Sequence, residues 1–306
     1  MDLSIVILNW NGLRFLKECI PSVITAAEAC GHNCELTVVD NGSSDQSMDY
    51  IKSNFSRVRA LPLQENLNFT KAMNIGIREA KYPVVICLNN DVVVDRNFIA
   101  PMAMHFLGDK MLFAVAAKML LCDKKTLNFG RAIGGFRYGF FVRKIIDSAM
   151  SINALYACGG GFAVDKNKFL ELGGFDEDMI VYWEDLDLCY RAWKQGWRTI
   201  YEPKSIIYHR FHGTNLKKYG KNGIDVLSGQ NYFLFIVKNI HDRIIFFQQL
   251  LFIPLLILLT LVSGKIYFAR GILQSVKRWP IFLKKRKTEK QKAIFSDRAV
   301  LRMSNR

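Results

Sequence analysis

Several carboxylate and amide side chains follow short apolar runs, a place where they could bind a metal ion or a phosphate group. Asp91 follows the apolar run at residues 84–88 and is preceded by Asn89 and Asn90. Magnesium and manganese prefer hard oxygen ligands and take their remaining ligands from phosphate and water. The triplet could therefore hold a divalent ion that also binds a diphosphate. An Asx-rich turn after a strand is the alternative explanation.

A second group of carboxylates comprises Glu184, Asp185 and Asp187, directly after Tyr182 and Trp183. One of these carboxylates, enclosed by the aromatic side chains, could act as a general base for an incoming hydroxyl group. A helix dipole also favours acidic residues in the first turn, so helix capping explains the cluster equally well.

Two further candidates lie near the ends of predicted strands. Asp40 follows the run at 34–39, and its carboxylate could accept hydrogen bonds from a nucleotide base or ribose hydroxyl, although a turn with Ser44 as a helix cap is also consistent. His209 follows a strand-like segment at 205–208 and could bind a metal ion, whereas a lone histidine is more often structural.

The elements that must position these side chains are strands that alternate with helices. Runs of strand length occupy residues 4–8, 34–39 and 84–88, and segments of helix length occupy 14–29, 45–54 and 69–80. This alternation predicts an α/β fold with a mostly parallel sheet. Ligands of such sheets bind at the carboxyl ends of the strands. The polar clusters at 9–11, 40–45 and 89–91 should therefore converge on one crevice.

The middle of the chain gives weaker signals. Residues 113–121 predict a strand, and residues 129–143, which are rich in glycine and aromatic residues, are interpreted as a loop that covers substrate. Farther along, the spacing of Leu186, Tyr190 and Trp193 predicts an amphipathic helix that ends at Gly196.

Positive charge is concentrated at the carboxyl-terminal end. The 306-residue chain has a formal net charge of +15, and residues 265–306 contain 13 Lys or Arg but only Glu289 and Asp297, a net charge of +11, which leaves +4 for the rest. A nucleic-acid enzyme carries its basic excess across the working domain. The distribution therefore argues against nucleic acid and favours an anionic membrane surface as the partner.

The uncharged residues 244–264 precede this basic tail and are long enough to span a bilayer. The first apolar run has no basic region before it, which predicts cytosolic synthesis and residence. One crossing would place the body and the basic tail on opposite sides of the membrane, against the positive-inside rule. We therefore expect an in-plane or re-entrant segment, with a true span or a buried helix as alternatives. The seven cysteines lack paired spacing and are expected to be reduced thiols.

Together these motifs resemble glycosyltransferase family 2, the inverting nucleotide-sugar transferases with a GT-A fold. The resemblance runs from Leu3 to about Asn239, and its most specific part is Gly-Gly-Phe-Asp at 173–176, followed by Tyr-Trp-Glu-Asp-Leu-Asp-Leu-Cys-Tyr-Arg at 182–191. It implies a catalytic domain over residues 1–240, with a Rossmann-like, mostly parallel sheet flanked by helices. An apolar helical segment and a basic, membrane-associating tail follow at residues 241–306.

The resemblance also implies roles for individual residues. Asp185 corresponds to the catalytic base, and Glu184 is expected to orient the acceptor. Asp91 matches the last carboxylate of a DxD-type motif for Mg²⁺ or Mn²⁺, with Asn89 at the first position. His209 lies where many relatives place an extra metal ligand, in a stretch that continues through His212 and Gly213 to Thr214.

Other residues match the part of the family site that binds the nucleotide. Asn68 stands where relatives commonly have glycine. The residues expected to bind the nucleotide are Leu8, Trp10, Asp40, Asn74, Asn90 and Asp91.

The implied reaction is transfer of one sugar from a dTDP-rhamnose or UDP-hexose donor to a lipid-linked saccharide. Its expected place is O-antigen-like or capsule-like polysaccharide synthesis at the cytoplasmic face of the inner membrane, with a peripheral or monotopic protein. Processive relatives carry a Gln-x-x-Arg-Trp element. Residues 274–279 have one residue too many and follow the apolar segment, so we predict single transfers.

Two other classes of function stay open. A nucleotidyltransferase on a similar sheet calls for a glycine-rich phosphate loop with a basic residue near the first strand, and residues 11–14, Asn-Gly-Leu-Arg, are a poor substitute. A non-catalytic protein that binds the membrane surface predicts no metal-dependent affinity for nucleotides.

Overall fold

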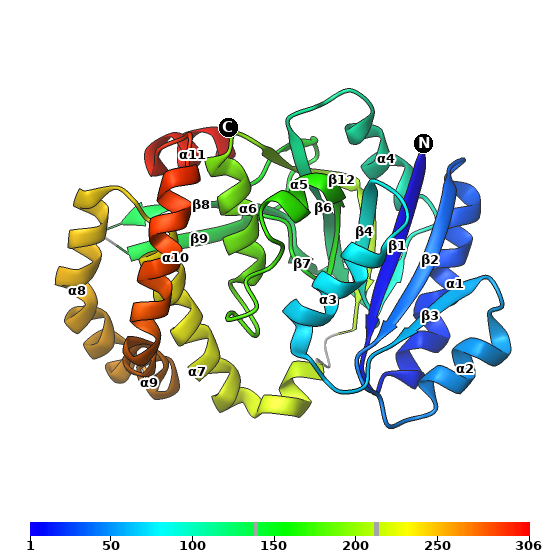
Figure 1. Cartoon of the computed structure of the whole chain (residues 1–306), viewed down its shortest axis with the longest axis horizontal. Coiled ribbons are helices and arrows are strands. Elements are labelled where there is room, and N and C mark those ends of the chain that lie inside the picture. Colours follow the sequence, from blue (N-terminus) through cyan, green and yellow to red (C-terminus); the bar gives the residue numbers. More distant parts are fainter. Residues whose placement is uncertain (138–139, 211–213) are drawn as a thin grey trace.

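The computed structural model describes residues 1–137, 140–210 and 214–306. A mixed sheet of ten strands forms the centre of this described part, and helices cover it on both sides (Figure 1). The strand order is β10-β12-β6-β11-β4-β1-β2-β3, with β5 paired to β12 and β7 paired to β6. The expected α/β architecture is confirmed.

Strands and helices alternate through the amino-terminal part of the chain. They are β1 (Asp2–Asn9), α1 (Leu13–Ala29), β2 (Asn33–Asp40), α2 (Ser47–Asn54), β3 (Val58–Pro62), α3 (Asn68–Glu79) and β4 (Val84–Asn89). These four strands are parallel to one another. The predicted strands and helices are all present. The sequence did not predict β3, because it is short, carries Arg59 and is partly exposed at the sheet edge.

The other half of the sheet mixes strand directions. Its elements are β5 (Val92–Val94), α4 (Ile99–Met104), η1 (His105–Leu107), β6 (Leu112–Leu121), β7 (Leu127–Phe129), β10 (Ile152–Asn153), β11 (Gly161–Asp165), α5 (Lys166–Glu171) and β12 (Arg198–His209). Strand β11 lies antiparallel between β4 and β6 and so joins the two halves. The long strand β12 runs parallel to β6 and ends at His209.

The segment expected to be a covering loop contains a β-hairpin, so that expectation is wrong for most of its length. Strands β8 (Arg131–Arg137) and β9 (Phe140–Ile146) pair as a separate antiparallel sheet. A Cβ atom on Gly134 would lie 2.6 Å from a methyl carbon of Leu155. The glycine therefore permits close packing of the hairpin against the body, and it does not mark irregular structure here.

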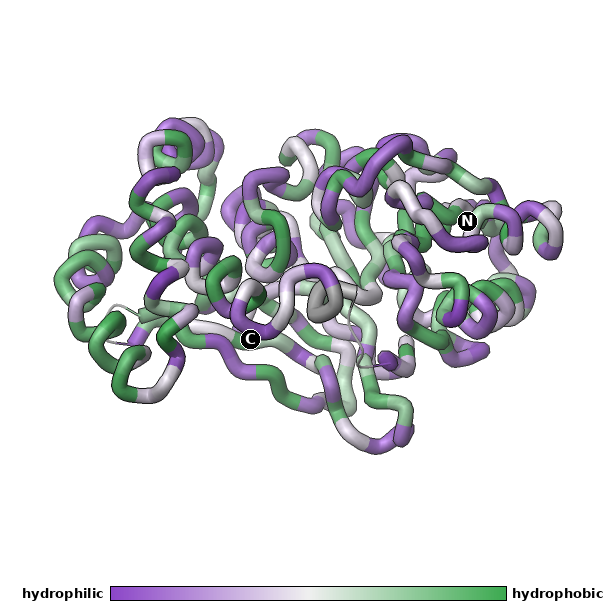
Figure 2. Tube along the Cα trace, turned by 90° about the horizontal axis from the view of Figure 1, so that it is seen from below, coloured by the Kyte–Doolittle hydropathy of each residue, from purple (hydrophilic) through white to green (hydrophobic). Residues whose placement is uncertain are grey.

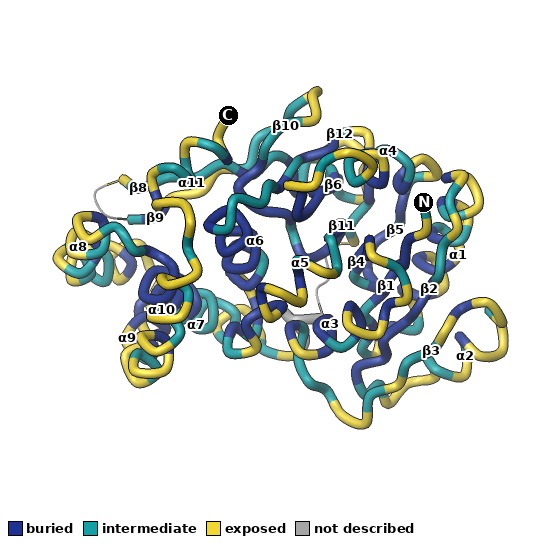
Figure 3. Tube along the Cα trace, turned by 45° about the horizontal axis from the view of Figure 1, so that its top comes forward, coloured by how far each residue is buried: buried dark blue, intermediate teal, exposed yellow. Residues whose placement is uncertain are grey.

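Helix α6 (Glu184–Lys194) is buried at the junction between the sheet and the carboxyl-terminal helices (Figure 3). The helices that follow are α7 (Thr214–Asn239), α8 (Arg243–Val262), α9 (Ile266–Ser275), η2 (Val276–Arg278), α10 (Trp279–Lys292) and α11 (Asp297–Ser304). Both α7 and α11 pack against α6. The chain therefore leaves the body at α8 and returns to it at α11.

Helix α8 is apolar yet mostly exposed. Within the described residues it is the one helix long and apolar enough to cross a membrane, and 17% of its most apolar window is buried. Figure 2 shows hydrophobic stretches beside hydrophilic ones among the helices at the end of the molecule far from the N-terminus. The exposed large side chains of α8 include Phe247, Leu251, Leu255, Leu258 and Val262. Their spacing of three and four residues places them on one helix face.

Candidate functional site

The register of the parallel strands brings the ends of β1, β2 and β4 to one edge of the sheet. Asn9 pairs with Asp40 across β1 and β2, and Leu8 pairs with Asn89 across β1 and β4. The Asn9 amide donates to Asp40 Oδ1 at 2.8 Å, and the Asn90 amide donates to Asn9 Oδ1 at 2.7 Å. The three polar clusters therefore meet at one edge, as parallel topology requires.

A cavity of about 460 Å³ opens at this edge, within the range of about 300–1,000 Å³ that is usual for small-molecule sites. Its walls come from segments far apart in the sequence. The predicted site residues that line it are Leu8, Trp10, Asn90, Asp91, Glu184, Asp185 and His209. The residues assigned to metal binding and those assigned to proton transfer thus share one cavity.

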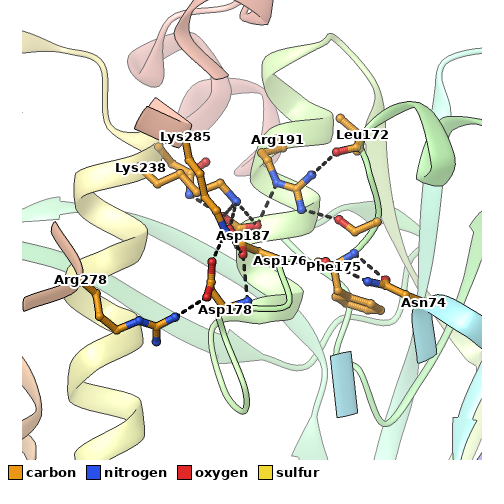
Figure 4. Close-up of polar contacts among 12 residues, drawn as sticks. Asn74, Leu172, Phe175, Asp176, Asp178, Asp187, Arg191, Lys238, Arg278 and Lys285 are labelled. Carbon is orange, nitrogen blue, oxygen red and sulfur yellow. Dashed lines mark hydrogen bonds and ion pairs between the residues drawn. The ribbon is translucent and has the colours of Figure 1, made fainter. Parts of the chain in front are cut away.

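Two residues predicted to bind nucleotide lie outside the cavity lining. Asp40 is buried and accepts hydrogen bonds from the backbone and the hydroxyl group of Ser43, while its neighbour Asn41 lines the cavity. Asn74 on α3 exchanges two hydrogen bonds with the backbone of Phe175, at 2.9 and 3.0 Å (Figure 4). Both residues hold the cavity walls in place, and their contacts with nucleotide stay predictions.

Asp91 and His209 form a pair that fits a divalent ion. Asp91 is 6% exposed, and its Oδ1 atom has no hydrogen-bond partner among the described residues. His209 Nε2 lies 3.5 Å from Asp91 Oδ2, and His209 Nδ1 lies 3.1 Å from Asn128 Oδ1. With the proton on Nδ1, the Nε2 lone pair faces the carboxylate. Two lone pairs at this distance are stabilised by a cation that both can bind.

The protein offers this ion an incomplete coordination shell. In the ranges that the structure describes, no group of three or more His, Cys, Asp or Glu side chains could hold a metal ion. Mg²⁺ and Mn²⁺ commonly take one or two protein ligands and complete their shell with substrate phosphates and water. The donor set at Asp91 and His209 is therefore of the kind that binds such an ion together with a phosphorylated ligand. His212 and Gly213 lie outside the described residues.

Glu184 and Asp185 begin α6 at the cavity and differ in their hydrogen bonds. Asp185 accepts backbone hydrogen bonds from Leu186 at 2.7 Å and from Gly159 at 3.4 Å. Burial raises the pKa of Asp185, although the charge of Arg143 and these backbone bonds oppose the shift. Burial and the charge of Asp185 together raise the pKa of Glu184 well above its ordinary value. Glu184 is thus the more strongly favoured of the two to carry a proton.

The backbone is strained where it enters α6. Tyr182 and Trp183 are consecutive residues with φ angles of 61° and 72°, in the left-handed region that bulky residues rarely adopt. Such strain persists only where surrounding structure holds it, and it concentrates at functional sites. Asn68 at the other wall has a φ of 64°, and asparagine tolerates this conformation better than most residues. Its position is therefore one that also suits glycine.

The third carboxylate of the acidic cluster is not in the cavity. Asp187 forms ion pairs with Arg191 and Lys238 at 2.9 Å each, and Lys238 also pairs with Asp176 at 2.7 Å (Figure 4). Burial alone would raise the pKa of Asp187, but the charges of Arg191 and Lys238 outweigh burial and lower it. Lys285 on α10 completes the network by pairing with Asp176. We call these five residues the α6 network.

The cavity also contains two basic residues that no sequence motif predicted, Arg143 and Lys218. Lys218 Nζ lies 2.8 Å from Asn68 Oδ1 and 5.3 Å from the centre of the Trp10 ring. It belongs to the first part of α7, before a kink at Gly220. Neither residue is part of a local motif. Only long-range contacts place each of them at the cavity.

These features define the chain by class. The family described as Glycosyl transferase family 2 matches residues 4–173. The chain belongs to glycosyl transferase family 2, and its sheet and flanking helices have the GT-A fold. The matched range ends before Glu184, so the roles of the acidic pair and of His209 do not follow from the match.

Among sequenced relatives, the poly-beta-1,6-N-acetyl-D-glucosamine synthase of Staphylococcus aureus is 27% identical over 209 residues. The alignment covers 65% of this chain and 50% of that protein. The chain therefore spans about half the length of the curated relatives it matches.

Solved structures of similar fold include GalNAc-T7 with UDP, GalNAc and Mn²⁺, with a TM-score of 0.62, 19% identity, and coverage of 79% of this chain and 48% of that one. A second is the mannosyltransferase PcManGT from Pyrobaculum calidifontis in complex with GDP-Man and Mn²⁺. Its TM-score is 0.57 at 13% identity, and the match covers 95% of this chain and 85% of that one. At these identities the likeness demonstrates the common fold.

Proposed function

We propose that the protein transfers a single sugar, with inversion, from a nucleotide-diphosphate donor to a lipid-linked saccharide in bacterial cell-envelope polysaccharide synthesis. The observation that carries this proposal is that the Asp91–His209 pair and the Glu184–Asp185 pair line one cavity. Such a cavity can hold a diphosphate at the first pair while a hydroxyl group approaches the second. The relative named as a polysaccharide synthase supports the biological setting.

The donor would be bound by the edge of the sheet. Leu8 and Trp10 would form the wall against the nucleotide. Asp40 would support that wall by accepting the hydrogen bond of Asn9, which lies between them in the sequence. Asp91 and His209 would hold Mg²⁺ or Mn²⁺, whose charge stabilises the departing nucleoside diphosphate. Either dTDP-rhamnose or a UDP-hexose is consistent with this arrangement.

Asp185 would then act as the general base. Its carboxylate takes the proton from the acceptor hydroxyl group as that oxygen bonds to the anomeric carbon of the donor. The bond between this carbon and the diphosphate oxygen breaks, and the diphosphate leaves with the electron pair. One displacement inverts the configuration. Burial and the charge of Asp185 raise the pKa of Glu184, and in its protonated form Glu184 would donate a hydrogen bond that orients the acceptor.

The structure also favours this reaction over nucleotidyl transfer. A Cβ atom on Gly12 would lie 1.9 Å from the Asn90 amide nitrogen, so Gly12 serves the close approach of two loops. The Arg14 guanidinium lies 4.4 Å from the centre of the Phe15 ring. Neither residue is among the described residues that line the cavity. The turn after β1 therefore lacks the features of a phosphate-binding loop.

Residues 241–306 would attach the domain of residues 1–240 to the cytoplasmic face of the inner membrane. The exposed apolar face of α8 is backed by a packed face that contains Ile245 and Gln249. One-sided exposure is expected of a helix that lies in the membrane plane. The segments before and after α8 both pack on α6, which supports a peripheral or monotopic attachment over a single crossing.

Calorimetric titration with UDP, GDP and dTDP, each with and without Mn²⁺, tests the donor site. We expect one nucleotide to bind only with the metal, and Asp91→Asn to weaken that binding by about 10- to 100-fold. Asp45→Asn is the matched control, because Asp45 follows the same sheet edge but does not line the cavity. Equal, metal-independent binding of all three nucleotides, or none, would refute the proposal.

A further inference from the structure

Arg143 on β9 is a cavity residue to which the reaction described above assigns no role. Its guanidinium carbon lies 4.7 Å from the centre of the Trp183 ring, and Nη1 donates to the Tyr156 hydroxyl group at 3.1 Å. Trp183 is itself fixed, because its ring contacts Tyr232 and its Nε1 donates to Ser228. The aromatic rings therefore hold the arginine head in one place.

This guanidinium group retains donors for a ligand. A guanidinium has five N–H donors, and the hydrogen bond to Tyr156 uses one of them. Within the described residues Arg143 forms no ion pair with a carboxylate, although Glu184 and Asp185 line the same cavity. A planar, pre-positioned guanidinium with unused donors is suited to bidentate binding of phosphate.

The hairpin that carries Arg143 also reaches the apolar helix α8. The rings of Phe140 and Phe252 are 6.1 Å apart, which joins the start of β9 to α8. Figure 1 shows β8 and β9 extending from the central region toward α8. Side chains alternate along a strand, so Phe141 and Arg143 share the face that contacts Trp183, and Phe140 lies on the other. Three residues of strand span about 10 Å.

We propose that Arg143 binds the phosphate group that joins the acceptor saccharide to its lipid. The inference rests on the proposed function, because it needs a lipid-linked acceptor whose hydroxyl group meets Asp185. Such an acceptor carries its phosphate on the membrane side of the sugar, and Arg143 shares the cavity with the acidic pair while the start of its own strand contacts α8. The arginine charge also offsets the repulsion that Glu184 and Asp185 would exert on an anionic acceptor.

Two acceptor analogues that share an N-acetylglucosamine and a decyl chain can test this inference. One is joined through a diphosphate and the other is a plain glycoside. Binding to the full chain is measured by calorimetry in EDTA, so that a metal ion at Asp91 and His209 cannot hold the diphosphate. We expect the wild type to prefer the diphosphate analogue by about 10- to 100-fold, as for a charge-assisted bidentate contact.

Arg143→Ala should remove this preference and leave affinity for the glycoside unchanged, while Arg143→Lys should retain part of it. Lys144→Ala is the matched control, because it removes one positive charge from the next position of the same strand and does not affect a cavity residue. Melting temperatures of the variants verify that each is folded.

Three results would overturn the inference. The first is that Arg143→Ala loses affinity for both analogues equally. The second is that Lys144→Ala loses as much affinity for the diphosphate analogue as Arg143→Ala does. The third is that Arg143→Ala binds nucleotide more weakly in the presence of Mn²⁺. The last result would place the donor diphosphate at Arg143. Failure of the proposed function is distinguishable, because the wild type would then bind no nucleotide with Mn²⁺ and would transfer no sugar.

Discussion

In the proposed mechanism, the acidic pair at the start of α6 divides two chemical roles between adjacent residues. Both Asp185 oxygens accept backbone hydrogen bonds, which orient the carboxylate at the cavity. Only the ionised form can take a proton, so the rate should rise with pH through the pKa of this group. Because burial raises the pKa of Asp185, this rise should occur above the pH at which an exposed aspartate titrates, about 3.9.

Asp185→Asn should lower kcat by about 10²- to 10⁴-fold, which is the usual contribution of a general base. Mn²⁺-dependent nucleotide binding should persist, because Asp185 is not one of the residues proposed to hold the metal or nucleotide. Steady-state kinetics and calorimetry of the same preparation measure the two quantities. Glu184→Gln is the comparison variant. Glutamine resembles a neutral glutamate, so Glu184→Gln should lower kcat less than Asp185→Asn does. A fully active Asp185→Asn variant would rule out the assignment of Asp185 as the base.

Local sequence patterns predicted many of the residues that line the cavity. They did not predict that Asp187 lies away from it or that Arg143 lies in it. Asp91 and the acidic cluster were recognisable because a strand end and a helix start are short-range features. The burial of Asp187 away from the cavity depends on Lys238, which is 51 residues away. Arg143 reaches Trp183 from a separate hairpin. Contacts of this range follow from tertiary packing and have no signature in the neighbouring sequence.

At the level of elements, α6 is held by the α6 network of Asp176, Asp187, Arg191, Lys238 and Lys285 (Figure 4). Burial alone would raise the pKa of Asp176, but Lys238 and Lys285 outweigh it, so the pKa is lowered. Carboxyl groups with lowered folded pKa values stabilise the fold above their unfolded pKa, near 3.9, and lose that contribution as the pH falls through the folded value. This stabilisation should thus be complete at neutral pH and decline below about pH 4.

Lys238→Met should lower the free energy of unfolding by about 3–5 kcal/mol, because it leaves Asp176 and Asp187 short of a buried cation. The measurement is urea denaturation at pH 7. Arg59→Met is the control, since it breaks an exposed pair with Glu79 and should cost less than about 1 kcal/mol. The difference between wild type and Lys238→Met should shrink as the pH falls below 4. If Lys238→Met lowers the free energy of unfolding equally at pH 7 and pH 3, an electrostatic role of Lys238 is contradicted.

The elements themselves differ in how well the sequence predicted them. Strands β1 and β4 are largely continuous apolar runs rich in Val, Ile and Leu, and β2 ends in the buried pair Val38–Val39, which is typical of strands buried on both faces. The hairpin β8–β9 contains paired glycines and phenylalanines that suit either a loop or a tightly packed strand. Its strand conformation depends on surfaces formed elsewhere, such as Leu155, which contacts the site of Gly134.

At the scale of the whole molecule, the basic carboxyl-terminal region packs partly on the body of the protein and is partly exposed on its surface. Lys285 and Arg278 pair with Asp178 of the body, at 2.6 and 2.8 Å, in partly exposed ion pairs that would compete with binding to lipid. Asp297 on α11 accepts a hydrogen bond from the Tyr190 hydroxyl group of α6. The region after α8 is therefore partly a packed extension of the body. The proposed membrane binding would then rely on the exposed apolar face of α8 together with the remaining exposed basic residues.

Leu251→Asp combined with Leu258→Asp should abolish binding to vesicles that contain phosphatidylglycerol. Both side chains are exposed on the same face of α8, and burying one leucine is worth about 1.5–3 kcal/mol, so partitioning should fall by at least about 100-fold. Flotation of the vesicles measures the bound fraction. Leu107→Asp changes a leucine on η1 whose exposure, 55%, is close to the 57% of Leu258, and it should have no effect. Binding of the wild type should weaken at high salt, because the basic residues contribute through screened electrostatic attraction. If the double variant floats as well as the wild type, α8 is not the surface that meets the membrane.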